Sequence, residues 1–231
     1  MRLKKIAAIV TGGLLVASLG MFGCSSGGGD ASDTAASEDT QAVAGQPAGE
    51  GITPAEGTLE QPAQIGEWLT TTIYSSGDEK HHPIYYRVTG VDFDQAKAED
   101  AIKAYNDASS VVKLQGLDAD DAKNLEYMTV SYELYVPEAV PGGKYGLTPP
   151  TLRLAVYGTD GGSLKVDGVT YIGLYSSDVT LDEPDWLQPG ESMTGTSLLA
   201  IPKNASEFLI QSDYSDSETD ESVDTYTLAR R

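Results

Sequence analysis

The sequence is poor in the residues that most often carry covalent or metal chemistry. Its 231 residues include one cysteine and two histidines, and the histidines are neighbours, His81 and His82. A single cysteine cannot form a disulfide within the chain, so the core alone must stabilise the folded part. Adjacent side chains of an extended segment point in opposite directions, so His81 and His82 are not expected to chelate one ion.

The sequence also lacks the short motifs that identify common active sites. It contains no P-loop, no dinucleotide glycine motif, no H-E-x-x-H zinc motif and no EF-hand spacing. The stretch 190–195 differs from the G-x-S-x-G nucleophile elbow and is predicted to lie in a strand. An enzyme is therefore not expected, although abundant carboxylates leave a carboxylate-based hydrolase open as a third hypothesis.

Basic residues are scarce. The chain has 15 Lys and Arg residues against 35 Asp and Glu residues, a net charge of −20 at pH 7. This charge argues against nucleic acid and against anionic lipid surfaces as partners, because both are negative. The charge permits a cation or a basic protein as partner. The alternative is that the charge serves only to keep the protein soluble.

The first 23 residues are predicted to be a lipoprotein signal peptide. Basic residues at positions 2, 4 and 5 precede an apolar run, 6–22, that is shorter than the roughly 20 residues of a membrane-spanning helix. Gly23 and Cys24 follow and resemble the bacterial lipobox, although Met21 and Phe22 depart from its usual residues. The resemblance implies that Cys24 is acylated and anchors the chain in the bilayer. The alternative is an ordinary signal peptide with an incidental cysteine.

Residues 24–62 are predicted to be a disordered acidic tether. After Cys24 the segment consists mainly of Gly, Ser, Ala, Thr, Asp and Glu, and it contains neither Lys nor Arg. Such a composition cannot bury enough apolar surface to offset the entropy lost on ordering. As a flexible coil the tether spans about 35 Å on average. It is expected to hold a folded domain, 63–231, away from the bilayer.

Alternating patterns dominate residues 63–231 and predict a mainly β fold, an antiparallel β-sandwich. The clearest strand, 128–136, alternates apolar and polar residues and ends at Pro137. The strand 192–201 alternates in the same way and is expected to pair with a returning strand at 208–210. Residues 76–83 are expected to be a polar loop. Further strands are predicted at 68–74, 85–91, 152–157, 169–175 and 223–228, with a tight hairpin turn at 167–168.

One short helix is predicted within the sandwich. Asp92 or Asp94 is suited to cap its N-terminus, and Ala98, Ile102 and Tyr105 then fall on one narrow apolar stripe. The helix is expected to lie across an end or an edge of the sandwich, where it protects strands from pairing with other chains.

Several strand and turn motifs resemble one known family. They are the string P-G-E-S-x-T-G-x6-P-K-x-A-S-x-F at 189–208 and the segments 132–137, 145–149 and 167–174. Over roughly 65–228 the chain is similar to telokin-like, immunoglobulin-fold lipoproteins of unknown function from Gram-positive bacteria. The resemblance implies an immunoglobulin-like β-sandwich on the outer side of a Gram-positive cell membrane. It implies no catalytic residues, because these motifs are structural.

Two loops at the ends of strands are predicted to present binding residues. Tyr145 lies in the loop 137–150. Trp186 lies in the loop 178–188, and Tyr175 ends the predicted strand before that loop. Aromatic rings in such loops stack on sugars or peptides, but they also commonly pack within their own loop.

The second of these loops contains candidate calcium ligands, although no cofactor is required. Asp182, Glu183 and Asp185 supply the hard oxygen ligands that calcium prefers. The plainer alternative is a solvated acidic loop, and no other cofactor is expected.

Together these patterns favour a non-enzymatic, membrane-anchored, extracytoplasmic binding module presented on a flexible tether. Its loops 137–150 and 178–188 are expected to contact an envelope protein or a glycan. The main alternative is a solute- or glycan-binding lipoprotein that uses Tyr145, Tyr175 and Trp186.

Overall fold

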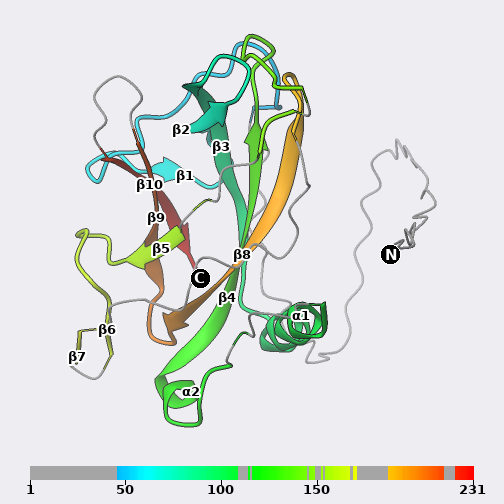
Figure 1. Ribbon diagram of the computed structural model, residues 1–231. Coiled ribbons are helices and arrows are strands. Elements are labelled where there is room, and N and C mark those ends of the chain that lie inside the picture. Colours follow the sequence, from blue (N-terminus) through cyan, green and yellow to red (C-terminus); the bar gives the residue numbers. More distant parts are fainter. Residues whose placement is uncertain are drawn as a thin grey trace, which may run out of the picture. The chain divides into compact units, whose positions relative to one another are not determined.

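The computed structural model describes residues 46–108, 114, 116–144, 146–148, 152, 154–166, 169–170, 187–215 and 222–231. All of them belong to one compact unit, Asp39–Arg231. Two four-stranded sheets pack together in this unit, and one helix of several turns, α1 (Gln95–Ala108), lies beside them (Figure 1). The predicted mainly β, sandwich-like fold with an inserted helix is confirmed.

The two sheets differ in strand order. The first sheet is β1-β10-β9-β5, formed by Ala63–Gln64, Ser222–Arg230, Glu207–Ser215 and Leu154–Tyr157. The second sheet is β2-β3-β4-β8, formed by Leu69–Ser75, Lys80–Asp92, Leu125–Tyr135 and Ser192–Pro202. A small separate pair consists of β6 (Lys165–Val166) and β7 (Val169–Thr170). Val166 pairs with Val169, so the strands expected to flank a turn at 167–168 do form a hairpin.

Strand β4 occupies the middle of the second sheet and matches its predicted pattern. It pairs with β3 on one side and with β8 on the other. Its inward side chains are at most 1% exposed: Met128, Val130, Tyr132 and Leu134. The predicted inward residues next to and within β5 are buried as well: Leu152, Leu154 and Val156.

The face of β2 differs from the expected one. The alternation of 68–74 puts Trp68, Thr70 and Thr72 on one face, and Trp68 predicts that this face is the core face. The buried alternation of β2 instead starts one residue later, at Leu69, and continues through Thr71 and Ile73. Trp68 is itself only 2% exposed, because it packs with Ile52 in a separate small cluster. The burial of Trp68 is confirmed, and the assignment of its neighbours to the core face is wrong.

Strand β3 begins earlier than predicted, at Lys80, so the expected polar loop 76–83 is strand in its second half. His81 is the direct partner of Tyr74 on β2, and the two rings meet edge to face with 5.3 Å between their centroids. Cross-strand pairing of this kind stabilises polar strand ends that hydropathy alone does not reveal.

Strands β8 and β9 both form, but they do not pair with each other. β8 pairs with β4 in the second sheet, whereas β9 lies between β10 and β5 in the first. The turn after Pro202, closed by the bond from Ala205 N to Pro202 O (3.0 Å), carries the chain from one sheet to the other. The expected strand pair is therefore a crossover between sheets, because Phe208 and Ile210 face the core from the opposite side.

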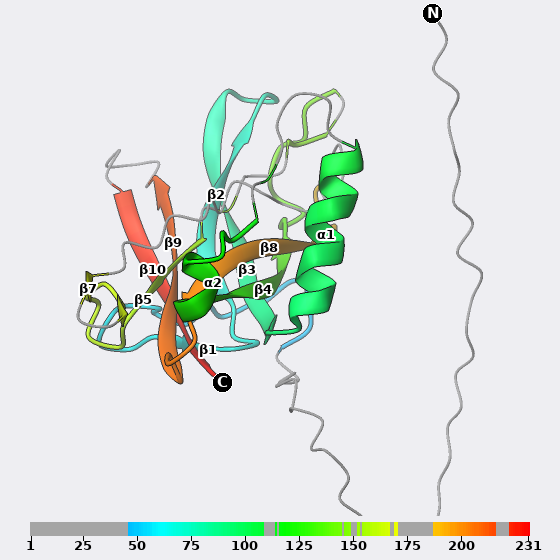
Figure 2. The ribbon, with the colours of Figure 1, turned by 90° about the horizontal axis from the view of Figure 1, so that it is seen from below.

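Helix α1 begins as the sequence predicts. Asp94 Oδ1 accepts hydrogen bonds from the backbone N–H groups of Ala96 (3.0 Å) and Lys97 (3.2 Å), which caps the first turn. Ala98 and Ile102 are buried against Tyr127 of β4 and Leu198 of β8. The helix thus covers the outer face of the second sheet rather than an end of the sandwich (Figure 2).

The C-terminal part of the predicted tether belongs to the folded unit. Ile52 is 8% exposed, and Ala55 N donates to Trp68 O at 2.7 Å. Gly57 O accepts from Tyr226 N at 2.8 Å. The prediction of a disordered tether over 24–62 is therefore wrong for 46–62, because backbone hydrogen bonds and a single isoleucine order a segment of polar composition. Residues 24–45 lie outside the described chain.

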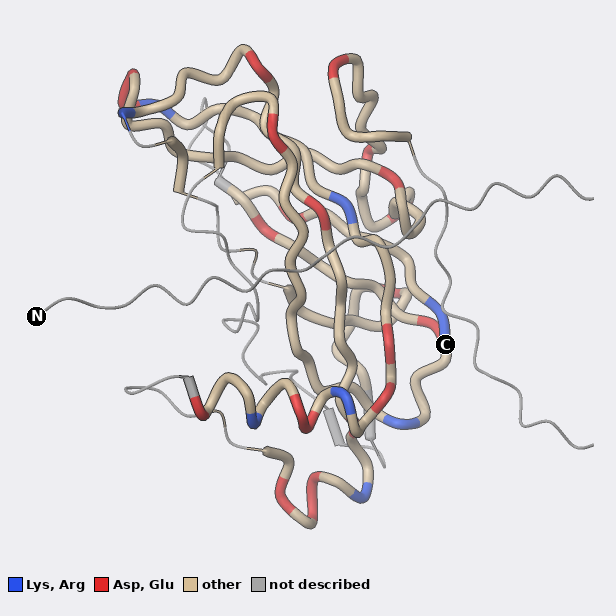
Figure 3. Tube along the Cα trace, turned by 90° about the vertical axis from the view of Figure 1, so that its right-hand side faces the viewer, with Lys and Arg blue, Asp and Glu red and all other residues tan. Residues whose placement is uncertain are grey.

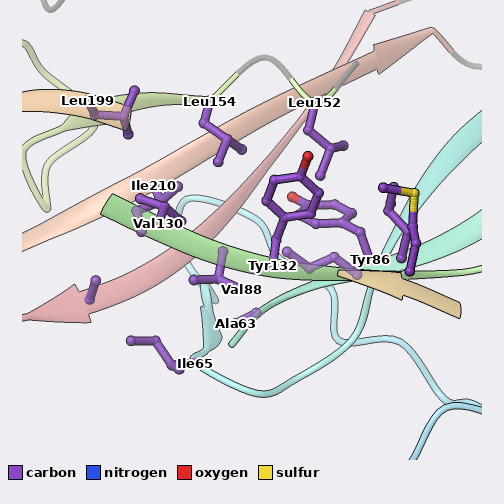
Figure 4. Close-up of a cluster of buried hydrophobic side chains, with 14 of the residues drawn as sticks. Ala63, Ile65, Tyr86, Val88, Val130, Tyr132, Leu152, Leu154, Leu199 and Ile210 are labelled. Atoms are coloured by element: carbon purple, nitrogen blue, oxygen red, sulfur yellow. The ribbon is translucent and has the colours of Figure 1, made fainter. Parts of the chain in front are cut away.

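The main core fills the space between the two sheets, and Figure 4 shows Tyr86 and Tyr132 within it. The Tyr86 hydroxyl lies 2.6 Å from Thr225 Oγ1, which itself donates to Ser212 O at 3.1 Å. Since Thr225 has one hydroxyl hydrogen, Tyr86 is the donor of this pair. Burial disfavours the phenolate and raises the pKa of Tyr86 to about 12.

Gly195 on β8 is expected to be indispensable to the packing of Tyr132. A Cβ atom at this position lies 2.8 Å from Cε2 of Tyr132, and closer still to its hydroxyl end. Gly195→Ala should lower the free energy of unfolding by about 1–3 kcal/mol in urea denaturation, because the ring must shift in a packed core. Gly90→Ala is the matched control, since Gly90 is also a strand glycine and a Cβ there meets nothing within 4 Å. Equal losses from both substitutions would contradict this prediction.

Tyr86 should make the protein less stable in alkali. Its pKa is about 12 in the folded chain and about 10 when unfolded, so the stabilisation is complete below pH 10 and is lost as pH rises. The loss should be about 1.4 kcal/mol per pH unit between these values. Urea denaturation at pH 8 and pH 11 checks this: Tyr86→Phe should remove this part of the decrease. Tyr74→Phe, on an exposed ring, is the control and should behave like the parent chain.

Candidate functional site

A groove of ligand size lies between α1, the segment 116–127 and the turn after β8. Its volume is about 470 Å³, within the range of sites that take small molecules. The floor is mainly apolar, formed by Ile102, Leu117, Leu125 and the Tyr127 ring. Polar groups stand among its other lining residues, which include Gln95, Glu99, Glu126 and Lys203.

Two amide side chains of α1 fix the helix wall of this groove. Gln95 Oε1 accepts from Tyr127 N (2.8 Å), and Gln95 Nε2 donates to Tyr127 O (2.9 Å). Asn106 makes the same double contact with Leu114, at 2.7 Å and 2.9 Å. Gln95 and Asn106 are about three helical turns apart, so both lie on the face of α1 that covers the sheet. Helix α1 is thereby joined to β4 through Gln95, and through Asn106 to Leu114 in the segment that follows the helix.

The Tyr127 hydroxyl fixes the opposite wall. It accepts a hydrogen bond from Leu117 N at 2.6 Å. The ring is only 7% exposed, so it supports the groove floor while its hydroxyl holds the loop. The short helix α2 (Asp121–Asn124) continues this wall, and Asp118 Oδ1 accepts from two N–H groups at its start, both at 2.8 Å.

The third side of the groove is closed by contacts of Lys203 and Arg231. Lys203 Nζ donates to Ala122 O at 2.6 Å, which joins the turn after β8 to α2. Arg231 pairs with Glu126, donates to Lys203 O at 2.9 Å and lies over the Phe93 ring. Each wall is thus held by hydrogen bonds, and those of Gln95 with Tyr127 and of Lys203 with Ala122 join segments distant in sequence.

Charges of both signs surround the groove. Glu99 and Lys203 stand on its rim, and acidic and basic positions alternate along the first turns of α1 (Figure 3).

The Lys97 ammonium donates to Asp92 and lowers the pKa of that carboxyl, while the pKa of Lys97 is raised by the same contact. Backbone N–H groups of Asp121 and Asp120 lower the pKa of Asp118. These carboxylates are therefore ionised at neutral pH and stabilise the starts of the two helices.

The lining of the groove offers apolar surface, a side-chain amide and charged groups as contacts for a ligand. Within the described residues, no group of three or more His, Cys, Asp or Glu side chains is placed to hold a metal ion. The Tyr127 hydroxyl is occupied by Leu117, and no histidine lines the groove. His82 instead contacts Asp78 in the β2–β3 hairpin, with Nε2 3.0 Å from both carboxylate oxygens, and this contact lowers the pKa of Asp78.

The binding residues predicted from the sequence lie outside the described part of the chain. This applies to the lipidation site Cys24, to the aromatic residues Tyr145, Tyr175 and Trp186, and to the calcium ligands Asp182, Glu183 and Asp185. The described backbone does bring the two predicted loops together. Leu147 and Leu187 form an antiparallel bridge with N–H···O bonds of 2.8 Å and 2.9 Å.

The groove residues were not identified from the sequence. No sequence motif singles out Gln95, Tyr127 or Lys203 as a binding residue. The one available signal was the pair of amides, Gln95 and Asn106, on the apolar stripe of the helix, where side chains without a hydrogen-bonding role are usually apolar.

Comparisons with protein-family models, with curated proteins and with solved structures found no match to this chain. In the described residues, no helix is long and apolar enough to cross a membrane.

Proposed function

We propose that this protein is a membrane-anchored, extracytoplasmic, non-enzymatic binding module. The anchor is Cys24, acylated after removal of residues 1–23, and the intervening acidic segment holds the domain away from the bilayer. The basic start, the short apolar run and the lone cysteine of the sequence support this assignment. Its place is the outer side of the cell membrane of a Gram-positive bacterium, as the family resemblance implies.

The groove beside α1 is the observation that carries a binding role. It has an apolar floor, a polar rim and walls held by hydrogen bonds, which is the usual construction of a preformed ligand site. Glu99 and Lys203 on its rim suit a neutral or zwitterionic ligand with an apolar side, such as a short peptide segment of an envelope protein. No Ser, Thr, Cys or His stands among its described lining residues, so the groove has no hydroxyl or thiol nucleophile paired with a histidine base.

The immunoglobulin-like topology is part of this proposal. In immunoglobulin constant domains, strands B and E share one sheet and strands C, F and G share the other. The pairing of β4 with β8, and of β5 and β10 with β9, is consistent with this arrangement if these strands correspond to B, E, C, G and F. The resemblance of the motifs at 189–208 and 132–137 to the lipoprotein family gives further support.

A second candidate function is solute or glycan binding at the other end of the sandwich. The bridge between Leu147 and Leu187 favours it, because these residues lie two positions after Tyr145 and one position after Trp186. Aromatic residues of two loops joined in this way could form one stacking surface with Tyr175. Calcium bound by Asp182, Glu183 and Asp185 belongs to this alternative, and a carboxylate-based hydrolase remains the third hypothesis.

Anchoring through Cys24 is tested by measuring whether the protein is acylated. In a Gram-positive host fed radiolabelled palmitate, the protein should carry the label and sediment with membranes. Cys24→Ala should abolish the label and release the chain to the medium or leave it unprocessed, whereas Ser25→Ala should behave like the parent. Label that persists in the Cys24→Ala protein would refute the proposed anchor.

The groove is tested by blocking it. Ala122 is exposed on the groove wall, so Ala122→Trp should fill the space, while Ala96→Trp adds the same ring on an exposed part of α1 outside the groove. A thermal-shift screen of tripeptides, sugars and calcium should yield a peptide that raises the Tm of the parent and of Ala96→Trp, but not of Ala122→Trp. At about 100 times its Kd the ligand adds roughly 2.7 kcal/mol of stability. A sugar that stabilises all three proteins would favour the loop site instead.

A further inference from the structure

The start of the described chain is held by a prepared binding surface on the second sheet. Gln46 O accepts two hydrogen bonds, from Trp68 Nε1 (2.8 Å) and from Arg87 Nη1 (2.7 Å). Arg87 is itself positioned by Glu133, whose Oε2 accepts from Nε (2.9 Å) and Nη2 (2.6 Å), and its guanidinium lies 4.4 Å from the centre of the Trp68 ring. Two donors therefore converge on one carbonyl before the chain reaches the first strand.

The next contact is hydrophobic and is separate from the main core. Ile52 packs with Trp68 and Tyr135, and Ala48 and Tyr85 lie against this cluster. None of these residues belongs to the cluster that fills the space between the sheets. Loss of the Ile52 contact therefore removes apolar burial from the outer face without opening the core.

The segment then crosses from one sheet to the other. Ala55 N donates to Trp68 O, one residue before β2 of the second sheet, and Gly57 O accepts from Tyr226 N in β10 of the first. Gly57 has φ +61° and approaches Leu69 so closely that a Cβ atom would overlap its side chain. We call residues 46–57 the strap; in Figure 1 it is the blue stretch that runs along the upper end of the sheets toward β1.

These contacts lie in a row, and a tether attached at Gln46 loads them one at a time. We propose that the strap is a releasable element: tension on the tether peels residues 46–57 off the sandwich while both four-stranded sheets stay folded. The direction of the load rests on the proposed membrane anchor at Cys24. Release frees 12 residues, about 40 Å of chain when fully extended, and so lengthens the connection to the membrane by this length less the distance that the bound strap already spans. It also uncovers Trp68 and Tyr135.

The strap is tested by pulling the unlipidated mature chain between its single cysteine, Cys24, and a C-terminal handle. Before the sheets unfold, we expect a separate, reversible step whose contour gain is about 40 Å, the extended length of 12 residues, less the distance that the bound strap already spans. Ile52→Ala should lower the force of this first step and leave the main unfolding force unchanged. Thr53→Ala is the matched control, because Thr53 is an exposed neighbour, and it should change neither step.

Hydrogen exchange supplies a second, force-free readout. In Ile52→Ala the amide of Ala55, which is bonded to Trp68 O, should exchange at least about tenfold faster, while the amide of Val130 in β4 is unaffected. A single unfolding event without a first step, or equal acceleration at Ala55 and Val130, would overturn the proposal. Both measurements use unlipidated protein, so a failure of the strap is distinguishable from a failure of acylation at Cys24.

Discussion

The burial of β4 between two neighbouring strands and beneath the opposite sheet is the constraint on which the rest of the structure depends. Four successive inward side chains, from Met128 to Leu134, are almost inaccessible to solvent. With a single cysteine in the chain, no intramolecular disulfide can assist this core. Both faces of the strand are used, because inward residues join the main core while Tyr127 and Tyr135 support the groove and the strap cluster on the outer face. The candidate site and the releasable element are therefore built on opposite ends of one strand, Leu125–Tyr135.

The alternation of apolar and polar residues predicted most strands, because a period of two is a local property of the chain. It located β4, β8 and β10, and the inward face of β4, without any knowledge of their partners. It could not determine which sheet β9 joins, because Phe208 and Ile210 would be equally buried in either sheet. It also failed at β2. Trp68 is buried outside the main core, so counting alternate residues from Trp68 selects the wrong face of the strand. The extension of β3 through His81 depends on Tyr74 of the neighbouring strand, which is information that a single segment does not contain.

The groove was beyond prediction for a different reason. Its walls depend on hydrogen bonds between side-chain amides and backbone groups, such as Gln95 with Tyr127, that are 32 residues apart. Glutamine at the start of a helix and lysine in a turn are ordinary surface residues until their partners are known. The predicted lipidation site and the predicted loop ligands are the reverse case, because sequence patterns indicate them but they lie outside the described residues.

The strap shows why composition misjudged the boundary between tether and domain. A segment poor in apolar side chains is predicted to be disordered because it buries little surface. Residues 46–57 are ordered mainly through their backbone, since the carbonyls of Gln46 and Gly57 and the amide of Ala55 all have partners in the sheets. Hydropathy does not record such bonds, because every residue type supplies the same backbone groups. A segment held in this way gains little from its own side chains, Ile52 excepted, and its attachment depends on the positions of Trp68 and Arg87. The sandwich therefore orders a segment that composition alone assigns to the tether, and the attachment of this segment depends on whether those two side chains hold it.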